Sequence, residues 1–203
     1  MKMKKYLLII LAAVGITTAS SEAKAQSPIR YGARAALNLS QYSGDIPGDM
    51  KAGAAFGVFG NYALTHELFL QAGLDISLKG TKDKVMGVKT DFNPIYLQLP
   101  IHIGYNLPLN HISSLKFSAG PYLAYGLGGK AKVQVGDATE KVSVFGKNKS
   151  LHHFDFGFGG KMAYQYDFIE GFIGYDYGIT NASKISGVTA RNSNLYLGVA
   201  YHF

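Results

Sequence analysis

The chain has 203 residues, no cysteine, and a formal net charge of +7 at pH 7. This length suits a single domain. The lack of cysteine excludes disulfide bonds, thiol catalysis and zinc–cysteine sites.

The first 25 residues have the features of a secretory signal peptide. Lys2, Lys4 and Lys5 precede an apolar run over residues 6–16, and Ala23 and Ala25 have the A-x-A spacing of a cleavage site. The alternative, an N-terminal membrane anchor, would need about 20 apolar residues, and without cysteine there is no lipoprotein anchor. The sequence therefore predicts a signal peptide over residues 1–25 and a mature domain over residues 26–203.

Removal of this leader takes four of the 20 basic residues and one of the 13 acidic residues, which leaves a net charge of +4. The mature domain is thus less basic than the whole chain suggests. We expect no nucleic-acid partner.

Eight segments of the mature chain alternate between large apolar residues and small or polar ones. This period of two predicts β-strands with two different faces. The segments cover residues 29–40, 55–64, 67–79, 94–107, 115–127, 153–166, 172–179 and 194–203.

The connections between these segments alternate in length. Short turns are expected near residues 65–66, 108–114 and 167–171. Longer loops are expected near residues 41–51, 80–93, 128–151 and 181–192. In the third of these loops, KVQV and KVSVF also alternate, so the flanking strands could extend beyond the membrane as a protruding hairpin with an edge for β-augmentation. Short turns on one side and long loops on the other are typical of outer-membrane barrels. The prediction is an all-β fold, an eight-stranded antiparallel up-and-down transmembrane β-barrel, with both termini on the periplasmic side of the cell outer membrane.

A soluble lipocalin-like barrel would show the same alternation with its apolar face turned inward. Three features favour the membrane barrel. The polar face is rich in glycine, it carries charges of both signs, and aromatic residues of the apolar face gather beside the short turns as an interfacial girdle. The girdle residues are Tyr31, Tyr62, Tyr105, Phe117, Tyr164, Tyr201 and Phe203. The predicted interior polar network consists of Arg34, Asp75, Lys79, His102, Lys116, Asp155, Lys161 and Asp176.

The last predicted strand ends on an aromatic residue of its apolar face. Such an ending resembles the signal that the barrel-assembly machinery of Gram-negative outer membranes reads, because an apolar strand edge stays available for pairing until the barrel closes. The residues of this predicted assembly signal are Leu195, Leu197, Val199, Tyr201 and Phe203.

Five stretches resemble PorT-type outer-membrane β-barrel proteins, and together they cover nearly the whole mature chain. In order they are RYGARAALNLS, YLQLPIHIGYNL, GPYLAYGLGGK, HFDFGFGGKMAY and LYLGVAYHF. The resemblance implies an eight-stranded barrel in the outer membrane and gives a hint of a role in secretion. It implies no catalytic residues.

Enzymatic and metal-dependent functions have little support in the sequence. Asp75, Ser77 and His102 lie on predicted interior faces, where an acid–base pair is conceivable, but a structural polar network explains the same residues. His152 and His153 are adjacent and point to opposite faces of a strand, so they cannot share one metal ion. We expect no enzyme activity, no metal and no cofactor.

A diffusion pore is not expected, because eight strands enclose a lumen that side chains fill. A narrow porin-like channel stays open as an alternative. The favoured function is a structural or interaction role through the long loops of a monomeric barrel, in contact with outer-membrane lipid. One loop carries a basic patch that could contact lipopolysaccharide or a protein partner, although it could equally be ordinary solvated loop. The patch consists of Lys130, Lys132, Lys141, Lys147 and Lys149.

Overall fold

The structure is a computed structural model that describes residues 29–45, 48–85, 88–135, 138–146 and 151–203. The predicted signal peptide, residues 1–25, lies outside the described residues, as do Lys147 and Lys149 of the basic patch. Within the described part of the chain, no helix is both long enough and apolar enough to span a membrane.

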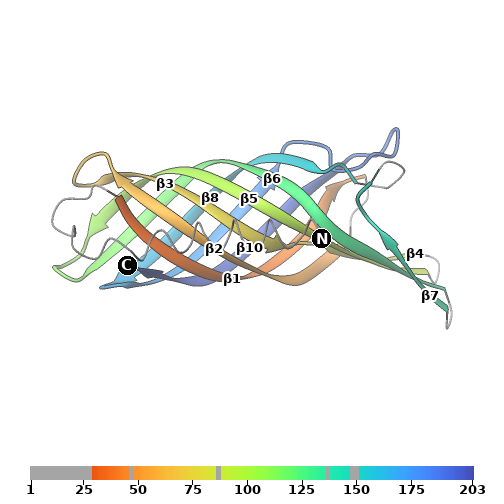
Figure 1. Ribbon diagram of the computed structural model, residues 1–203, viewed down its shortest axis with the longest axis horizontal. Helices are drawn as coiled ribbons and strands as arrows, with labels where there is room; N and C mark the ends of the chain where they lie inside the picture. Colours follow the sequence, from red (N-terminus) through yellow and green to blue (C-terminus); the bar gives the residue numbers. More distant parts are fainter. Residues whose placement is uncertain (1–28, 46–47, 86–87, 136–137, 147–150) are drawn as a thin grey trace, which may run out of the picture.

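The described residues form ten antiparallel β-strands, eight of which close into a ring (Figure 1). The ring runs β1–β2–β3–β5–β6–β8–β9–β10 and closes where β1 pairs with β10. Because each strand of the ring pairs with its neighbours in the chain, the fold is the predicted all-β, up-and-down barrel of eight strands. The strands are β1 (Ile29–Gly44), β2 (Asp49–Ala63), β3 (Leu68–Leu78), β4 (Thr81–Val85), β5 (Val88–Pro108), β6 (Ser113–Val135), β7 (Ala138–Ser143), β8 (Phe154–Tyr166), β9 (Ile169–Gly178) and β10 (Ala190–His202).

Three tight connections lie at one end of the barrel, which we call the short-turn end. They link β2 to β3, β5 to β6, and β8 to β9. The last of them is shorter than the predicted turn over residues 167–171, because β9 already begins at Ile169. Asp167 has a φ of 53°, in the left-handed region that tight hairpin turns use. The strand start therefore places Glu170 on a barrel face, where the sequence prediction had a turn.

The opposite end, the long-loop end, contains more strand than the eight predicted segments. Residues 80–93 were expected to be a long loop, and residues 128–151 a long loop or a protruding hairpin; much of both segments is paired. β4 pairs with the start of β5, β5 with the end of β6, and the end of β6 with β7. The physical reason is that apolar and polar residues keep alternating in these stretches, as in KVQV and KVSV. We call this four-stranded extension, residues 81–93 and 130–143, the protruding sheet (Figure 1).

The outer face of the barrel is apolar over all its strands. The predicted girdle residues at the short-turn end are 39–70% exposed. A second group of outward aromatic residues lies toward the long-loop end. These are Tyr125, Phe154, Phe158, Tyr175 and Tyr177, all at least 38% exposed. Two aromatic belts that flank an aliphatic band are the pattern of a barrel wall in a bilayer.

The interior aromatic residues follow one packing rule. Each of six rings lies directly opposite a glycine of the neighbouring strand, and in most of these pairs a Cβ added to the glycine would overlap the ring. Glycine on one strand therefore makes room for a large ring from the next, and this explains the glycine-rich interior face. The pairs are Phe59–Gly32, Phe69–Gly104, Tyr96–Gly126, Tyr122–Gly157, Phe172–Gly198 and Tyr196–Gly174.

Candidate functional site

The lumen at the short-turn end is organised around one buried carboxylate, Glu170, whose side chain is completely inaccessible to solvent. Lys116 Nζ lies 3.0 Å from Glu170 Oε2, and Lys161 Nζ lies 3.1 Å from Glu170 Oε1. His202 Nε2 lies 3.0 Å from Oε2. These three residues come from β6, β8 and β10, so Glu170 ties β9 to three strands. A buried carboxylate with this many partners has its charge compensated and its lone pairs satisfied.

An open vestibule of about 560 Å³ lies beside Glu170 at the short-turn end. Lys116 and His202 line it, and they are also two of the groups that bind Glu170. The vestibule therefore ends at the Glu170 cluster. The ring centres of Phe59 and Phe172 lie 6.0 Å and 5.2 Å from Lys161 Nζ. Both rings help to fill the lumen at the level of the Glu170 cluster.

The middle of the lumen holds an ion pair between strands that are far apart in the chain. Arg34 Nε donates to Asp75 Oδ1 at 2.7 Å, and Arg34 Nη2 donates to Asp75 Oδ2 at 2.6 Å. Arg34 also reaches Gln71, which accepts a hydrogen bond from Lys161 at 3.0 Å. The bidentate Arg–carboxylate geometry fixes both side chains, and Gln71 links this pair to the Glu170 cluster.

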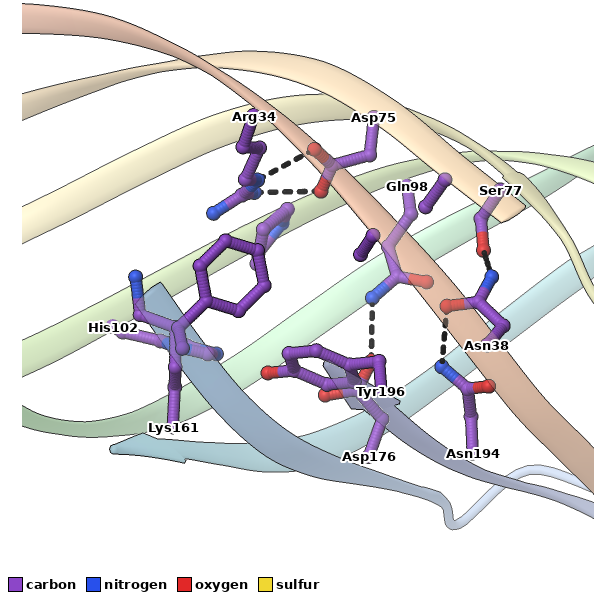
Figure 2. A pocket seen from close by; sticks show the side chains of 14 residues that line it. Arg34, Asn38, Asp75, Ser77, Gln98, His102, Lys161, Asp176, Asn194 and Tyr196 are labelled. Atoms are coloured by element: carbon purple, nitrogen blue, oxygen red, sulfur yellow. Dashed lines mark hydrogen bonds and ion pairs between the residues drawn. The ribbon is translucent and has the colours of Figure 1, made fainter. Parts of the chain in front are cut away.

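A small polar cavity of about 40 Å³ lies next to this ion pair (Figure 2). Gln98 Nε2 donates to Asp176 Oδ2 at 2.8 Å, and Asn38 Nδ2 donates to Ser77 Oγ at 3.0 Å. Each of these contacts joins residues of different strands at the cavity wall. A volume of this size suits a few water molecules and is too small for a nutrient or a peptide. His102 also lines the cavity, and its Nε2 is buried without a hydrogen bond from any described residue.

The lumen toward the long-loop end binds a carboxylate in a different way. Asp155 is buried and accepts hydrogen bonds from three neutral groups: Tyr122 at 3.1 Å, Thr180 at 2.8 Å and Asn192 at 2.9 Å. The buried cation of this region is Lys79. Its ammonium lies 4.8 Å from the ring centre of Tyr122, and no hydrogen-bond partner for it is found among the described residues.

The mouth of the barrel is closed by the segment that follows β7. Phe145 packs against Tyr96 with ring centres 5.6 Å apart, and it stacks on His153 at 4.9 Å. Leu151 is buried and bridges to Phe145 and to Ser183. This segment belongs to the predicted loop over residues 128–151. Part of that loop therefore folds back into the lumen.

The structure brings the eight predicted interior residues together in two groups. Arg34, Asp75, Lys116 and Lys161 belong to the short-turn half, and Lys79, Asp155 and Asp176 belong to the long-loop half. His102 lies opposite Gln71 in register, so it also belongs to the short-turn half. Sequence reasoning missed Glu170, although its spacing of two from Phe172 and six from Asp176 put all three on one face. With Glu170 included, the described lumen holds four cations, which are Arg34, Lys79, Lys116 and Lys161, and four carboxylates.

The residues considered for acid–base chemistry are kept apart by the register. Asp75 lies opposite Gln98, and His102 lies opposite Gln71. Asp75 is bound by Arg34, and Ser77 is bound by Asn38. In the described part of the chain, no three His, Cys, Asp or Glu residues gather as they would around a metal ion.

A family model of the outer membrane protein β-barrel domain matches residues 9–203 of the sequence. The chain belongs to this family. Its place is therefore the outer membrane, and its apolar outer face is the face that meets lipid.

Solved structures of outer-membrane proteins align with most of this chain. A major outer membrane protein from Thermus thermophilus aligns over 87% of this chain and 100% of its own, with 16% identity and a TM-score of 0.51. Neisserial surface protein A aligns over 87% and 98%, with 17% identity and a TM-score of 0.49. Ail, the attachment invasion locus protein of Yersinia pestis, aligns over 87% and 100%, with 15% identity and a TM-score of 0.44. A comparison with curated protein sequences gives no match.

The C-terminal strand of this outer-membrane barrel protein closes the ring. β10 pairs with β1 from Gly32–His202 to Gly44–Ala190. Leu197, Val199 and Tyr201 are 48–59% exposed, and Phe203 is 70% exposed. Leu195 is half-buried. The backbone of Phe203 donates to the carbonyl of Tyr31 at 2.9 Å, so the terminal residue is held beside β1.

The described part of the predicted basic patch lies on the protruding sheet. Lys130 and Lys132 are exposed on β6. Lys141 occupies the register position on β7 opposite Lys132. The neighbouring β4 adds exposed Lys82, and the acid of β5 in this region, Asp91, is bound by Lys51.

Proposed function

We propose that this outer-membrane β-barrel protein conducts no solutes and acts through the protruding sheet as a structural or interaction element of the envelope. The observation that carries the proposal is the contrast between the two parts. Between the vestibule and the mouth, the lumen is filled except for the small polar cavity, and its charges are balanced. Beyond Leu127, the last outward apolar residue of β6, the strand continues for eight residues, about 25 Å, into the protruding sheet, whose strands β4 and β7 lie outside the eight-stranded ring.

The proposal includes an orientation and an assembly route. The short-turn end, with both ends of the mature chain, faces the periplasm, and the protruding sheet faces the outside, because outer-membrane barrels have short periplasmic turns and long external loops.

The barrel-assembly machinery reads the edge of the last strand, which is formed by Leu195, Leu197, Val199, Tyr201 and Phe203. The closed ring has no free edge in its wall, which supports a monomer. The finer resemblance to PorT-type proteins, and with it a link to secretion, stays a prediction.

Conductance in a planar bilayer tests the closed lumen against the narrow-channel alternative. We expect the refolded protein to insert without discrete current steps, since the Glu170 cluster, the central ion pair and the mouth segment block successive levels of the lumen. A large porin added to the same bilayer shows that the assay detects channels. Reproducible steps from the wild-type protein would overturn the proposal.

Removal of the sheet tips tests whether the protruding sheet is separate from barrel stability. Residues 83–90 and 133–140 are each replaced by an Asn-Gly turn, which suits two-residue hairpins. Thr81, Phe92 and Ala131 are retained, because they pack inside the mouth. We expect the variant to fold and to show the same mobility shift on unboiled gels. If it fails to fold, the sheet serves barrel assembly instead of interaction.

A further inference from the structure

The outward side of the protruding sheet carries a strip of lysines, which we define as Lys82, Lys130 and Lys132. All three are exposed. Their neighbours Thr81 and Ala131 are buried, and Phe92 packs with Ala131 against the apolar cluster in the mouth. Because successive residues of a strand point to opposite faces, the buried neighbours fix the lysine strip on the outer side. The strip thus continues the side of the wall that faces lipid.

The height of the lysine strip follows from the length of β6. From Phe117 in the girdle to Leu127, the outward side of β6 is apolar over ten residues. This distance is about 33 Å along the strand, or about 25 Å along the barrel axis at the usual tilt of about 40°. It equals the expected apolar band of an outer-membrane barrel, about 25 Å. A register shift between β5 and β6 leaves Leu127 without a partner on β5, as in a β-bulge, and keeps Lys130, three residues later, on the outward side. Lys130 lies about 7 Å higher, which is the depth of the lipid head groups.

The acids near the lysine strip do not cancel its charge. Asp91 lies opposite both Lys82 and Lys132 in register, but its carboxylate is bound by Lys51, whose ammonium also contacts Asn93 and the carbonyl of Phe92. Asp49 is exposed and lies opposite Lys82 in register, so it offsets that lysine. Lys130 lies opposite Asn93 and Ser143, and Lys132 lies opposite Asp91 and Lys141. Because Asp91 is already bound by Lys51, these acids leave positive charge on Lys130 and Lys132.

We propose that Lys130 and Lys132, with Lys82 beside them, bind the phosphate groups of the glycolipids that surround the barrel in the outer leaflet. The inference rests on the proposed function, since it names the partner of the protruding sheet and requires that sheet to face outward. The lysine stems lie along the upper edge of the apolar band, and their ammonium groups reach the phosphates. A lipid phosphate is favoured over a soluble anion because the lysine strip lies directly above the lipid-facing wall, on the same side of the sheet.

Acetylation footprinting of the lysines tests the assignment. The full mature protein is folded into phosphatidylcholine vesicles that contain either lipid A or dephosphorylated lipid A, which differ only in the phosphates. We expect acetylation of Lys130 and Lys132 to slow by about fivefold with lipid A. Lys184, exposed at the same end and bound to the carbonyl of Gly146, is the internal control and keeps its rate. Equal rates in both vesicles, or equal slowing at Lys184, would overturn the proposal.

A second measurement uses variants and does not depend on labelling. The temperature at which the compact band is lost on gels is compared between the two vesicles for wild type, Lys130→Gln/Lys132→Gln, and the matched control Lys184→Gln/Arg191→Gln. We expect lipid A to raise this temperature for wild type and control, and to leave the double lysine variant unchanged. A rise of equal size in the lysine variant contradicts the proposal.

Inorganic phosphate separates the two sources of the anion. Added in excess to vesicles with dephosphorylated lipid A, it is expected to leave the acetylation rates unchanged. If it protects Lys130 and Lys132 as lipid A does, the site binds soluble anions and the lipid assignment fails. The acetylation results do not depend on conductance. If the protein gives current steps in a bilayer but lipid A still protects Lys130 and Lys132, the closed-lumen proposal is wrong and the lipid-phosphate proposal stands.

Discussion

The two halves of the lumen bury a carboxylate in opposite ways. At the short-turn end, Glu170 is surrounded by charged or ionisable partners, Lys116, Lys161 and His202. At the long-loop end, Asp155 is held by the neutral donors Tyr122, Thr180 and Asn192, while Lys79 lies over aromatic rings.

The difference shows that charge balance and local pairing are separate requirements. The lumen as a whole balances four cations with four carboxylates, but the pairing is concentrated in one half. Breaking a buried ion pair leaves an uncompensated charge, which costs more than the loss of a neutral hydrogen bond. The short-turn half should therefore be the more sensitive half to substitution.

The largest effect is expected for Glu170→Gln. The change leaves the Lys116 and Lys161 ammonium groups buried beside a neutral amide, so the free energy of unfolding should fall by about 3–5 kcal/mol. Urea unfolding of the protein in phosphatidylcholine vesicles measures it. A loss below about 1 kcal/mol would show that the cluster is hydrated and loosely coupled.

The matched change in the other half is Asp155→Asn. The amide keeps the shape and one acceptor oxygen but loses charge-assisted bonds from Tyr122, Thr180 or Asn192, so we expect a loss of about 2–3 kcal/mol. The same urea titration gives the value. If this loss exceeds that of Glu170→Gln, the ranking of the two halves is wrong.

Tyr122→Phe removes one of the three neutral donors that bind Asp155, so it measures what a single neutral hydrogen bond contributes in the long-loop half. The ring stays opposite Gly157 and over Lys79, and only the hydroxyl bond to Asp155 is lost. The expected loss of stability is about 1–2 kcal/mol. A double-mutant cycle with Asp155→Asn checks the assignment, since the two effects should not add if they report the same bond.

The smallest effect is expected for Lys79→Met. In the described part of the chain its ammonium has no hydrogen bond, so the loss of the cation–π contacts and of its attraction to buried Asp176 is offset by the removal of a buried charge, and the change in stability should stay within about 1 kcal/mol. Lys161→Met serves as the matched control, because it breaks the ion pair with Glu170. Equal large losses for both variants would mean that Lys79 is paired more tightly than the geometry indicates.

Much of the fold could be predicted because alternation is a local property of the sequence. Each strand shows which of its residues share a face, and the contrast between the two faces indicates lipid on one side and a packed interior on the other. The interior positions of Asp75, Lys79 and Asp155 follow from this parity alone.

The contacts inside the lumen could not be predicted, because parity does not determine register. Arg34 pairs with Asp75, 41 residues away, and Lys161 with Gln71, 90 residues away; a shift of two residues would preserve every face and change every partner. Glu170 was missed for a different reason. The residues around Asp167 read as a turn, and the turn residues were extended by three positions into β9.

The pairing of rings with glycines in the lumen has a consequence for how this sequence can change over time. At Phe69 and Gly104, for example, neither position can vary alone. A residue larger than glycine at 104 meets the ring, and a small residue at 69 leaves a void. Neutral drift should therefore proceed by coupled exchanges, so that the ring moves to the opposite strand while the total volume of the pair stays constant. In diverging descendants, the pairs Phe69–Gly104 and Tyr196–Gly174, whose glycines meet only side-chain atoms of their partners, would keep the sum of their side-chain volumes, whichever strand carries the ring.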